Sequence, residues 1–243
     1  MDPAIYRRMA ATQHQHWWFA ARREILAQVI ETLALPSPNA TILEIGCGTG
    51  ANLPMLARFG TVCAMENDAF SLQQVKKTTG IDVRDGSLPD RIPFDDRRFD
   101  LICVLDVLEH VKDDGASLET IRRLLAPGGR ILVTTPAYQW LYSSHDTHHH
   151  HFRRYTSRQL AQLARTAGLV PTRIGYFNTL LFPLAVVRRL YSRLLPGSGN
   201  DDTAMPGPLI NGILRRVFML EAFVARRWFA PFGVSVIAIL SPS

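Results

Sequence analysis

The stretch ILEIGCGTGANL, residues 42–53, decides the fold. It begins with an apolar segment typical of a buried strand, passes through Gly46, Gly48 and Gly50, and ends where a helix is expected. Glycine lets the backbone turn tightly and approach a ligand closely. A helix that begins directly after such a turn presents free N–H groups and the positive end of its dipole to the ligand. The pattern therefore predicts a ligand-binding turn between a strand and a helix.

Two acidic residues indicate what kind of ligand this turn holds. The glycine spacing by itself also fits the dinucleotide-binding pattern G-x-G-x-x-A, which would end at Ala51. Glu44 lies two residues before the first glycine, where it would repel a phosphate but stabilise a cationic ligand. Glu66 ends the next apolar segment, where a carboxylate can bind two ribose hydroxyls. Together the two acids favour a cationic ligand that carries a ribose.

Short apolar segments alternate with helical segments over the rest of the chain. A first amphipathic helix is expected over residues 17–33. A later helix, over residues 156–168, has a capping box of Thr156 and Gln159 at its start and Gly168 at its end. Such alternation predicts a parallel sheet with helices on both faces. The strands are expected at residues 41–46, 61–66, 81–85, 99–105, 129–135, 169–177 and 233–240.

The positive charge is concentrated toward one end of the chain, whose net charge is +6. Residues 1–150 hold 15 Lys and Arg against 18 Asp and Glu, a net charge of −3. Residues 151–243 hold 12 Arg against three acids, a net charge of +9. This final part indicates an anionic partner, such as a membrane surface, a nucleic acid or an anionic substrate. A basic surface without any such partner explains the charge equally well.

Cysteine usage and hydropathy predict the compartment. Cys47, Cys63 and Cys103 lie in apolar segments and are too few for a disulfide framework, which favours reduced thiols. Residues 1–19 show no signal-peptide pattern. The longest charge-free apolar stretch, residues 174–187, is too short to span a bilayer. We therefore expect a cytoplasmic protein that can also lie peripherally on the inner face of the membrane.

Several motifs occur in the order found in a known family. LEIGCGTG, the acidic Glu66, FDLICVLDVLEHV and LLAPGGRILVTTP together resemble the class I S-adenosylmethionine-dependent methyltransferases, over roughly residues 40–178. The resemblance implies an α/β fold with a Rossmann-like seven-stranded sheet, its last strand antiparallel, and S-adenosylmethionine bound across the strand ends. One domain is expected over residues 1–243, made of an N-terminal helical segment (1–38), a cofactor-binding core (39–178), a helical insertion (179–232) and the last strand (233–243).

The resemblance also implies cofactor-binding roles for individual residues. The glycines of the first motif would cradle the methionine part of the cofactor. Glu44 would lie near its ammonium group, Glu66 would hold the ribose, and Asp85, after the third strand, would face the adenine amino group. Cofactor contacts are expected at Glu44, Gly46, Cys47, Gly48, Gly50, Glu66, Asn67, Asp85, Leu105 and Asp106.

The histidine-rich segment HDTHHHHFRRYT, residues 145–156, follows the fifth expected strand. Ligands of open α/β sheets bind at this edge, so we expect the segment to face the methyl acceptor. His145 or His151 can take a proton from an acceptor hydroxyl. Paired arginines can clamp an anionic group. Further acceptor contacts are expected at Asp146, Arg153, Arg154 and Tyr155.

The spacing H-D-x-x-x-x-H-x-R-R-Y within this segment resembles that of a bacterial subgroup of these methyltransferases, many of which act in lipid, quinone or cell-surface glycan pathways. We expect no metal ion at the histidines, because adjacent histidines diverge in direction and no Cys or Glu completes a known ligand spacing. An ordered loop whose arginines cap helix ends is the alternative to an acceptor-binding loop.

Residues 179–232 separate the last two expected strands and contain two basic amphipathic helices, at 180–195 and 209–229. Such helices suit a lid over the site, a contact with anionic lipid or a dimer interface. The sequence leaves these three roles open, and with them the choice between monomer and dimer. Residues 196–208 are typical of a linker.

The resemblance implies an enzyme that methylates a small-molecule or lipid-linked acceptor of the quinone, polyprenyl or glycan type, with oxygen favoured as the methylated atom. RNA or DNA methylation is a first alternative. The chain contains neither the Asn/Asp-Pro-Pro-aromatic group nor the Pro-Cys nucleophile of enzymes that act on bases, so a nucleic-acid partner is disfavoured. A non-catalytic, cofactor-binding partner at a membrane is a second alternative.

Overall fold

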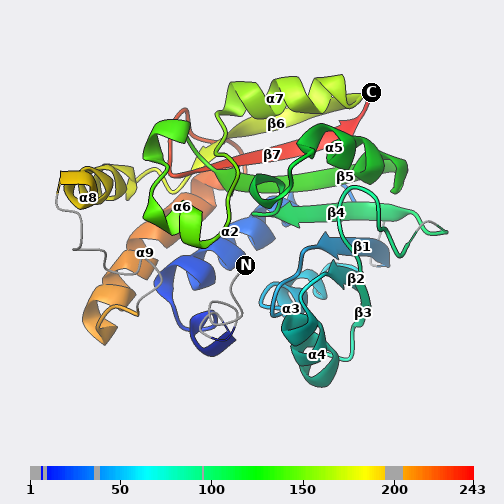
Figure 1. Ribbon diagram of the computed structural model, residues 1–243, viewed down its shortest axis with the longest axis horizontal. Coiled ribbons are helices and arrows are strands. Elements are labelled where there is room, and N and C mark those ends of the chain that lie inside the picture. The colour runs from blue at the N-terminus through cyan, green and yellow to red at the C-terminus, as the bar shows by residue number, and fades with distance from the viewer. Residues whose placement is uncertain (1–6, 8–9, 36–38, 95, 195–204) are drawn as a thin grey trace.

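The computed structural model describes residues 7, 10–35, 39–94, 96–194 and 205–243, so most of the linker expected at 196–208 lies outside the described residues. They form a sheet with helices on both faces (Figure 1). The strands are β1 Ala40–Ile45, β2 Gly60–Glu66, β3 Asp82–Asp85, β4 Phe99–Leu105, β5 Leu125–Pro136, β6 Leu169–Phe177 and β7 Ser235–Pro242. The helices are α2 Trp17–Glu31, α3 Leu53–Leu56, α4 Ala69–Thr78, α5 Asp114–Arg123, α6 Ser144–His148, α7 Ser157–Thr166, α8 Phe182–Leu194 and α9 Pro208–Ala225, with short 3₁₀ turns η1 Leu108–His110 and η2 Gln139–Leu141.

The seven strands follow the order β3-β2-β1-β4-β5-β7-β6. Strands β1 to β5 pair in parallel, whereas β7 is antiparallel to both of its neighbours. The predicted seven-stranded sheet with an antiparallel last strand is therefore confirmed. Strand bounds differ most from prediction at β5, which begins at Leu125 rather than at residue 129. The order reverses between β1 and β4, and open sheets of this kind bind ligands beside the carboxyl ends at such a reversal.

Both faces of the sheet are buried. Side chains alternate along a strand, so neighbouring residues of β1 point to opposite faces. Ile42 packs into a core formed with α2, α3, α4 and α9, whereas Leu43 packs into a core formed with α5 and α7. Because neither face meets water, β1 and β4 are apolar almost continuously instead of in alternation.

A well-capped helix, α7, follows the histidine-rich segment. The Thr156 hydroxyl accepts a hydrogen bond from the Gln159 N–H at 3.2 Å, and the Gln159 side-chain oxygen accepts one from the Thr156 N–H at 2.8 Å. Gly168 follows the helix with a φ of +72°, a left-handed conformation that glycine adopts without strain. The predicted capping box and glycine stop are confirmed, and they define where the preceding loop ends.

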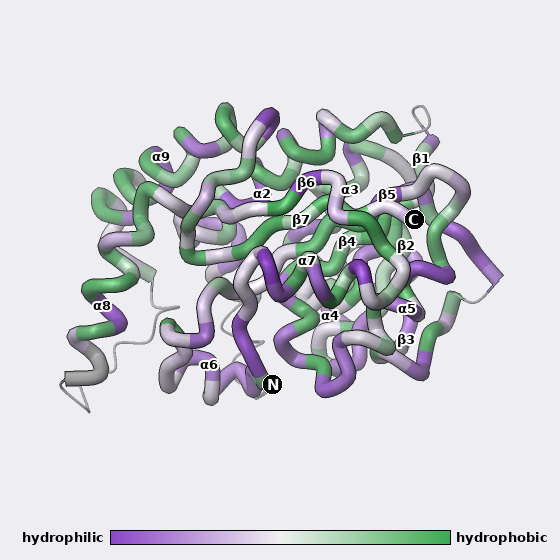
Figure 2. The backbone as a smooth tube through the Cα atoms, turned by 90° about the horizontal axis from the view of Figure 1, so that it is seen from above, coloured by the Kyte–Doolittle hydropathy of each residue, from purple (hydrophilic) through white to green (hydrophobic). Residues whose placement is uncertain are grey.

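The two helices of the insertion have different surroundings. α9 lies along α2 and covers one face of the sheet (Figure 1). Phe218 of α9 is fully buried, with ring centroids 6.1 Å from Phe177 and 6.0 Å from Trp17. α8 projects beyond the end of the sheet (Figure 2). No helix in the described part of the chain combines the length and the apolar character needed to cross a bilayer.

The packing of α9 predicts unequal effects for two phenylalanines of that helix. Phe218→Ala is expected to lower the free energy of unfolding by about 3–5 kcal/mol, because it leaves a cavity between α9 and the sheet. Phe223 is 81% exposed, so Phe223→Ala is expected to change the free energy of unfolding by less than about 0.5 kcal/mol. Urea denaturation of both variants measures the difference. Equal effects would mean that α9 is not anchored through Phe218.

Candidate active site

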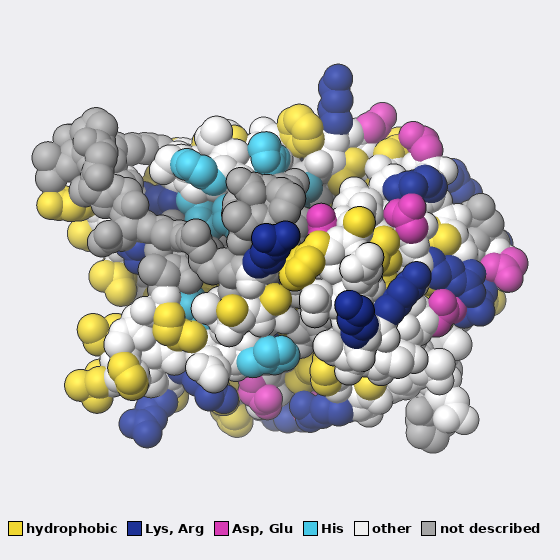
Figure 3. Space-filling view, turned by 60° about the horizontal axis from the view of Figure 1, so that its bottom comes forward, with side chains coloured by type: hydrophobic (Ala, Val, Ile, Leu, Met, Phe, Trp, Pro, Cys, Tyr) yellow, Lys and Arg dark blue, Asp and Glu magenta, His cyan; other side chains and the backbone are white. Residues whose placement is uncertain are grey.

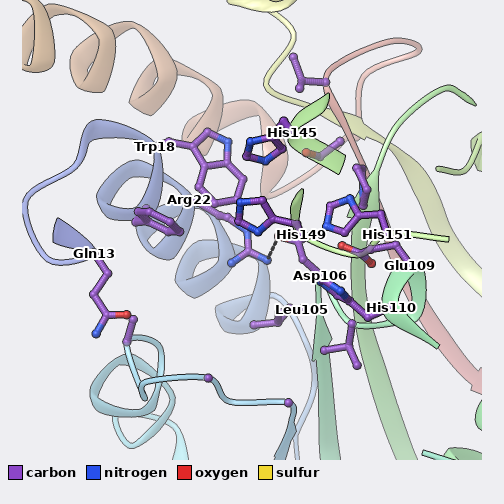
Figure 4. Close-up of a pocket in the computed structure, with 18 of the residues that line it drawn as sticks. Gln13, Trp18, Arg22, Leu105, Asp106, Glu109, His110, His145, His149 and His151 are labelled. Carbon is purple, nitrogen blue, oxygen red and sulfur yellow. Dashed lines mark ion pairs between the residues drawn. The ribbon is translucent and has the colours of Figure 1, made fainter. Parts of the chain in front are cut away.

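A cavity of about 890 Å³ opens at the carboxyl ends of β1 and β4. Its walls come from the N-terminal helical segment, the glycine turn, the segments that follow β4 and β5, and helices α8 and α9. In Figure 4, His149, His151 and Glu109 gather on one side of the cavity and Gln13 lies on the other. The cavity is large enough for two small molecules side by side, since single-ligand pockets begin at about 300 Å³.

Gly46 and Gly48 of the glycine turn after β1 line this cavity, whereas Gly50 does not. Gly46, Gly48 and Gly50 all have positive φ angles, of +68°, +52° and +84°. A Cβ atom on Gly46 would lie 2.7 Å from a methyl carbon of Val107, whereas a Cβ on Gly48 would meet nothing within 4 Å. Side chains at these positions would strain the turn or fill the space in front of it. The turn therefore fits the predicted cradle for a ligand.

Glu66, at the end of β2, ties the glycine turn to the start of α4. Its carboxylate accepts hydrogen bonds from the N–H groups of Gly48 at 2.7 Å, Asn67 at 2.8 Å and Asp68 at 3.0 Å. Glu66 is buried, and it lines the cavity together with Asn67. Its position is therefore fixed before any ligand arrives.

Glu44 is buried close behind the turn. One carboxylate oxygen accepts a hydrogen bond from the Asn52 side chain at 2.7 Å, and the other has no hydrogen-bond partner among the described residues. Burial raises the pKa of Glu44 to about 7. A cationic group beside the unpartnered oxygen would stabilise the ionised carboxylate. Glu44 does not itself line the cavity, so its carboxylate lies behind the wall that the glycine turn forms.

Three more residues of the expected cofactor set have clear positions. Cys47 and Leu105 line the cavity, and burial raises the pKa of the Cys47 thiol, which keeps it neutral. Asp85 does not line the cavity. Its carboxylate is 54% exposed and pairs with Arg91 at 2.7 Å, while Ser87 and Leu88 line the wall instead.

Asp106, directly after β4, is held by a residue that sequence reasoning missed. Arg22 of α2 forms an ion pair with Asp106 at 2.8 Å and donates a hydrogen bond to the Thr134 hydroxyl at 2.7 Å. The Arg22 guanidinium also lies 5.1 Å from the ring centre of Trp18. All of these residues except Thr134 line the cavity. The signal was present in the sequence, because Arg22 shares a helical face with the apolar Leu26.

The N-terminal segment closes the cavity near the glycine turn. Gln13 accepts a hydrogen bond from the Thr49 hydroxyl at 2.6 Å, and both residues line the cavity. Sequence reasoning placed a helix over 17–33 but assigned no site residue to this end of the chain. No local motif marks Gln13, so only the packing of α2 against the sheet brings it to the site.

Asp146 is the centre of the histidine-rich segment. Its fully buried carboxylate accepts hydrogen bonds from His151 Nδ1 at 2.8 Å, from two nitrogens of Arg154 at 2.8 and 2.9 Å, and from the Ser143 N–H at 2.9 Å. Burial opposes ionisation, but the hydrogen bonds from His151 and Arg154 outweigh it and hold the pKa of Asp146 well below its usual range. The segment is thus organised around a buried ion pair.

The other predicted acceptor contacts divide between the cavity and the rest of the fold. His145, His151 and Arg154 line the cavity, although the Arg154 guanidinium is held by Asp146. Asp146, Arg153 and Tyr155 do not line it. Arg153 pairs with Asp114 at 2.6 Å, and the Tyr155 hydroxyl donates a hydrogen bond to the same carboxylate at 2.7 Å. These last two contacts bind the loop to the start of α5.

Glu109 and His110, from turn η1, line the cavity beside His151. The Glu109 carbonyl accepts a hydrogen bond from the Phe152 N–H at 2.7 Å, which ties η1 to the histidine-rich segment. The Glu109 carboxylate is fully buried, and neither of its oxygens has a hydrogen-bond partner in the described structure. Burial raises its pKa well above the usual range. Sequence reasoning left Glu109 unassigned because a surface helix was an equally good explanation for it.

The imidazoles on this side are largely shielded from water. Burial lowers the pKa of His110 to about 3 and that of His149 to about 4. The ring centroids of His110 and His151 lie 4.5 Å apart in an edge-to-face arrangement. At neutral pH, His110 and His149 are therefore uncharged. Taken together, the cavity has an acidic, glycine-lined side and a side rich in imidazole.

Comparison with known proteins shows which family the chain belongs to. Residues 17–174 match a family model described as a methyltransferase domain. The chain is 28% identical over 177 residues to a probable S-adenosylmethionine-dependent methyltransferase of Mycolicibacterium smegmatis, covering 71% of this chain and 67% of that one. It is 33% identical over 107 residues to a ubiquinone biosynthesis O-methyltransferase of Xylella fastidiosa, covering 42% of this chain and 44% of that one. The match to the ubiquinone enzyme thus spans less than half of its length.

Solved structures share the fold at low sequence identity. A geranyl diphosphate methyltransferase in complex with S-adenosylmethionine aligns with a TM-score of 0.62 and 15% identity, over 100% of this chain and 92% of the other. A chain from a Haloferax volcanii complex of a methyltransferase activator and a putative methyltransferase aligns with a TM-score of 0.61 and 19% identity. The alignment covers 98% of this chain and 94% of the other. These structures show the fold alone. The family match over residues 17–174, with the relative of Mycolicibacterium smegmatis, shows that the chain belongs to the S-adenosylmethionine-dependent methyltransferases and takes its methyl group from that cofactor.

Proposed function

We propose that this enzyme transfers the methyl group to an oxygen atom of an apolar, lipid-linked acceptor, which it takes from an anionic membrane surface. The observation that carries the proposal is the cavity itself. It joins the glycine turn to an imidazole-rich wall, and the apolar, basic helix α8 forms one of its sides.

The cofactor half supplies an activated methyl group. S-Adenosylmethionine carries this group on a positively charged sulfur, so the chain has to bind and orient the donor more than activate it. Glu44 and the backbone of the glycine turn would hold the methionine part, and Glu66 the ribose. Arg22 fixes the Asp106 carboxylate beside them. The ammonium group would lie on the cavity side of the glycine turn, where its charge would stabilise the ionised form of the buried Glu44.

Proton removal from the acceptor depends on His151. Its Nδ1 hydrogen bond to Asp146 orients the ring and leaves the Nε2 lone pair for the cavity. Asp146 is itself held by two hydrogen bonds from Arg154. Asp146 and Arg154 are therefore positioning residues for His151, and Arg153 and Tyr155 hold the loop through Asp114. This assignment replaces the expectation that the arginines bind the acceptor directly.

The surface around α8 and α9 suits a lipid membrane. Leu181, directly before α8, and Ala185 and Arg189 of α8 are spaced four residues apart on the side that lines the cavity. Large apolar side chains on other faces of the two helices are exposed, as Figure 3 shows at the end of the molecule that carries α8 and α9. They include Val187, Leu190, Tyr191, Leu209, Ile210, Ile213, Leu220 and Phe223.

Charge supports the same partner. The exposed basic side chains of α9 and the turn after it are Arg215, Arg216, Arg226 and Arg227. Glu221, the acid of α9, is buried. An exposed apolar surface with arginines around it matches an interface with anionic lipid. A helix pair serving only as a lid would instead bury these apolar groups. The O-methyltransferase relative named for ubiquinone biosynthesis supports both the oxygen acceptor and its apolar character.

Cofactor binding is expected to release a proton from Glu44. A cation beside the carboxylate favours its ionised form, so affinity for S-adenosylhomocysteine should rise as the pH rises through about 7. Calorimetric titrations at pH 7 in buffers of different ionisation enthalpy measure the released proton. Glu44→Gln is the control, because it cannot titrate. Equal proton release by both proteins would remove the assignment of Glu44 to the ammonium.

His151→Ala is expected to lower the rate of methyl transfer by roughly 10²–10⁴-fold. The assay is transfer from S-adenosylmethionine to a polyprenylated phenol presented in phosphatidylglycerol vesicles. His148→Ala is the matched control, because His148 is exposed, lies in the same segment and does not line the cavity. Affinity for S-adenosylhomocysteine should be unchanged in both variants. A His151 variant with the rate of the control would contradict the assignment.

Phe223→Glu is expected to weaken sedimentation with phosphatidylglycerol vesicles severalfold, since it places a negative charge in the apolar surface. Val170→Glu makes the same change on an exposed residue of β6 and serves as the control. Binding of the unchanged protein should fall with added salt, because charge attraction is screened beyond about 8–10 Å at physiological ionic strength. Salt-sensitive binding to RNA in place of vesicles would support nucleic-acid methylation and contradict the membrane partner.

A further inference from the structure

The acceptor side of the cavity carries three side chains whose ligand atoms converge. One atom each from Glu109, His110 and His151 lies within 4.8 Å of the other two. In Figure 4 the Glu109 carboxylate lies between the rings of His151 and His110. Two imidazoles and a carboxylate form a common ligand set for catalytic zinc and related ions. The three side chains are therefore of the types that hold a metal ion, and the distances between their ligand atoms decide whether one fits.

The convergence is close to what a metal ion requires. If the three atoms stood at the full 4.8 Å from one another, an ion at their centre would lie about 2.8 Å from each, against about 2.0–2.2 Å in zinc sites. Closing this gap takes a shift of less than about 1 Å at each atom, which rotation of long side chains supplies. The open side faces the cavity, where His149 and His145 also lie.

His151 is already oriented in the manner of a metal ligand. Its Nδ1 is 2.8 Å from Asp146, and metal-binding histidines almost always direct their second ring nitrogen to a carboxylate or carbonyl in this way. The Asp146 carboxylate is fixed in turn by Arg154. The Nε2 of His151 is thereby directed away from the loop that carries it.

Glu109 gives an independent reason to expect a cation. Its carboxylate is fully buried and both oxygens are without a hydrogen-bond partner among the described residues. A buried, unpaired carboxylate is unfavourable, whereas one that coordinates a metal is not. The neighbouring cations do not satisfy it, because Arg22 pairs with Asp106 and Arg154 pairs with Asp146.

We propose that Glu109, His110 and His151 bind one divalent ion of the zinc type, with a coordination position open to the acceptor oxygen. This proposal replaces the expectation from sequence that no metal ion binds at the histidines, because Glu109 and His110 come from a different segment. The inference rests on the proposed function, since it assigns His151 its means of promoting proton loss. A hydroxyl bound to the ion loses its proton to water. The oxygen then forms a bond to the methyl carbon while the carbon–sulfur bond breaks, and that electron pair stays on sulfur. The ion is unchanged.

Metal binding is tested directly with chelator-treated, dialysed protein. Calorimetric titration with ZnCl₂ should show one ion per chain, and CoCl₂ should give visible absorption bands typical of low-coordinate cobalt. Glu109→Gln keeps the shape of the side chain and should lower the affinity by at least about 10–100-fold, the range reported for outer-shell changes alone. His148→Ala should bind like the unchanged protein. Circular dichroism and S-adenosylhomocysteine binding confirm that each variant is folded.

The absence of stoichiometric zinc and cobalt binding, or equal affinity in the Glu109→Gln variant, overturns the metal proposal. Methyl transfer to the polyprenylated phenol then separates the two inferences. Transfer that persists in chelator, and still depends on His151, leaves the proposed function intact with the imidazole itself taking the proton. Zinc binding without transfer to that acceptor supports the metal site and contradicts the proposed acceptor class.

Discussion

The site depends on a constraint of parallel sheets, namely that all parallel strands end at the same edge. β1 and β4 lie side by side, and the strand order reverses between them. Connections from the two strands leave toward opposite sides, so the space above their carboxyl ends stays open to a ligand. The glycine turn follows β1, Glu66 ends β2, Asp106 follows β4 and the histidine-rich segment follows β5. Backbone hydrogen bonding of the sheet thus brings together residues from across the chain.

The carboxylates around this edge, all buried except the partly exposed Asp106, are of two kinds. Glu66, Asp106 and Asp146 each accept several hydrogen bonds or pair with an arginine, so their charges are balanced within the protein. Glu44 and Glu109 each keep at least one oxygen without a protein partner. Because an unpaired buried charge is unfavourable, these two positions are where an added cation gains most. Glu44 lies behind the glycine turn, and Glu109 lines the imidazole-rich side of the cavity, so the two positions match the proposed cofactor and acceptor sides.

The insertion between β6 and β7 contacts the sheet and the cavity on one side and is exposed on the other. α9 is anchored to the sheet through Phe218, while α8 borders the cavity and projects outward. Because Phe218 anchors α9 to the sheet, the outward faces of α8 and α9 can stay apolar and exposed while the fold is kept. Such a surface is a liability in water alone, and it is consistent with a partner that covers it.

Most of the fold and the conformation of the glycine turn are predictable from sequence, because each rests on a local pattern. Apolar runs alternating with helices specify the sheet, a glycine turn between two acids specifies the cradle, and Thr156 with Gln159 specifies where α7 begins. These signals extend over a few residues, and hydrogen bonding within those residues is enough to produce them.

The side-chain partners on the imidazole-rich side of the cavity were decided by the tertiary structure alone. The segment 145–156 shows five histidines and two arginines. The sequence does not show that Arg154 pairs with Asp146, that Arg153 pairs with Asp114, or that Asp85 faces solvent. Nor does it show that Glu109 and His110 stand beside His151, since no spacing within one segment reveals them. These pairings depend on distances between segments that only the packed sheet and its loops determine, because a side chain's partner is set by what lies next to it in space.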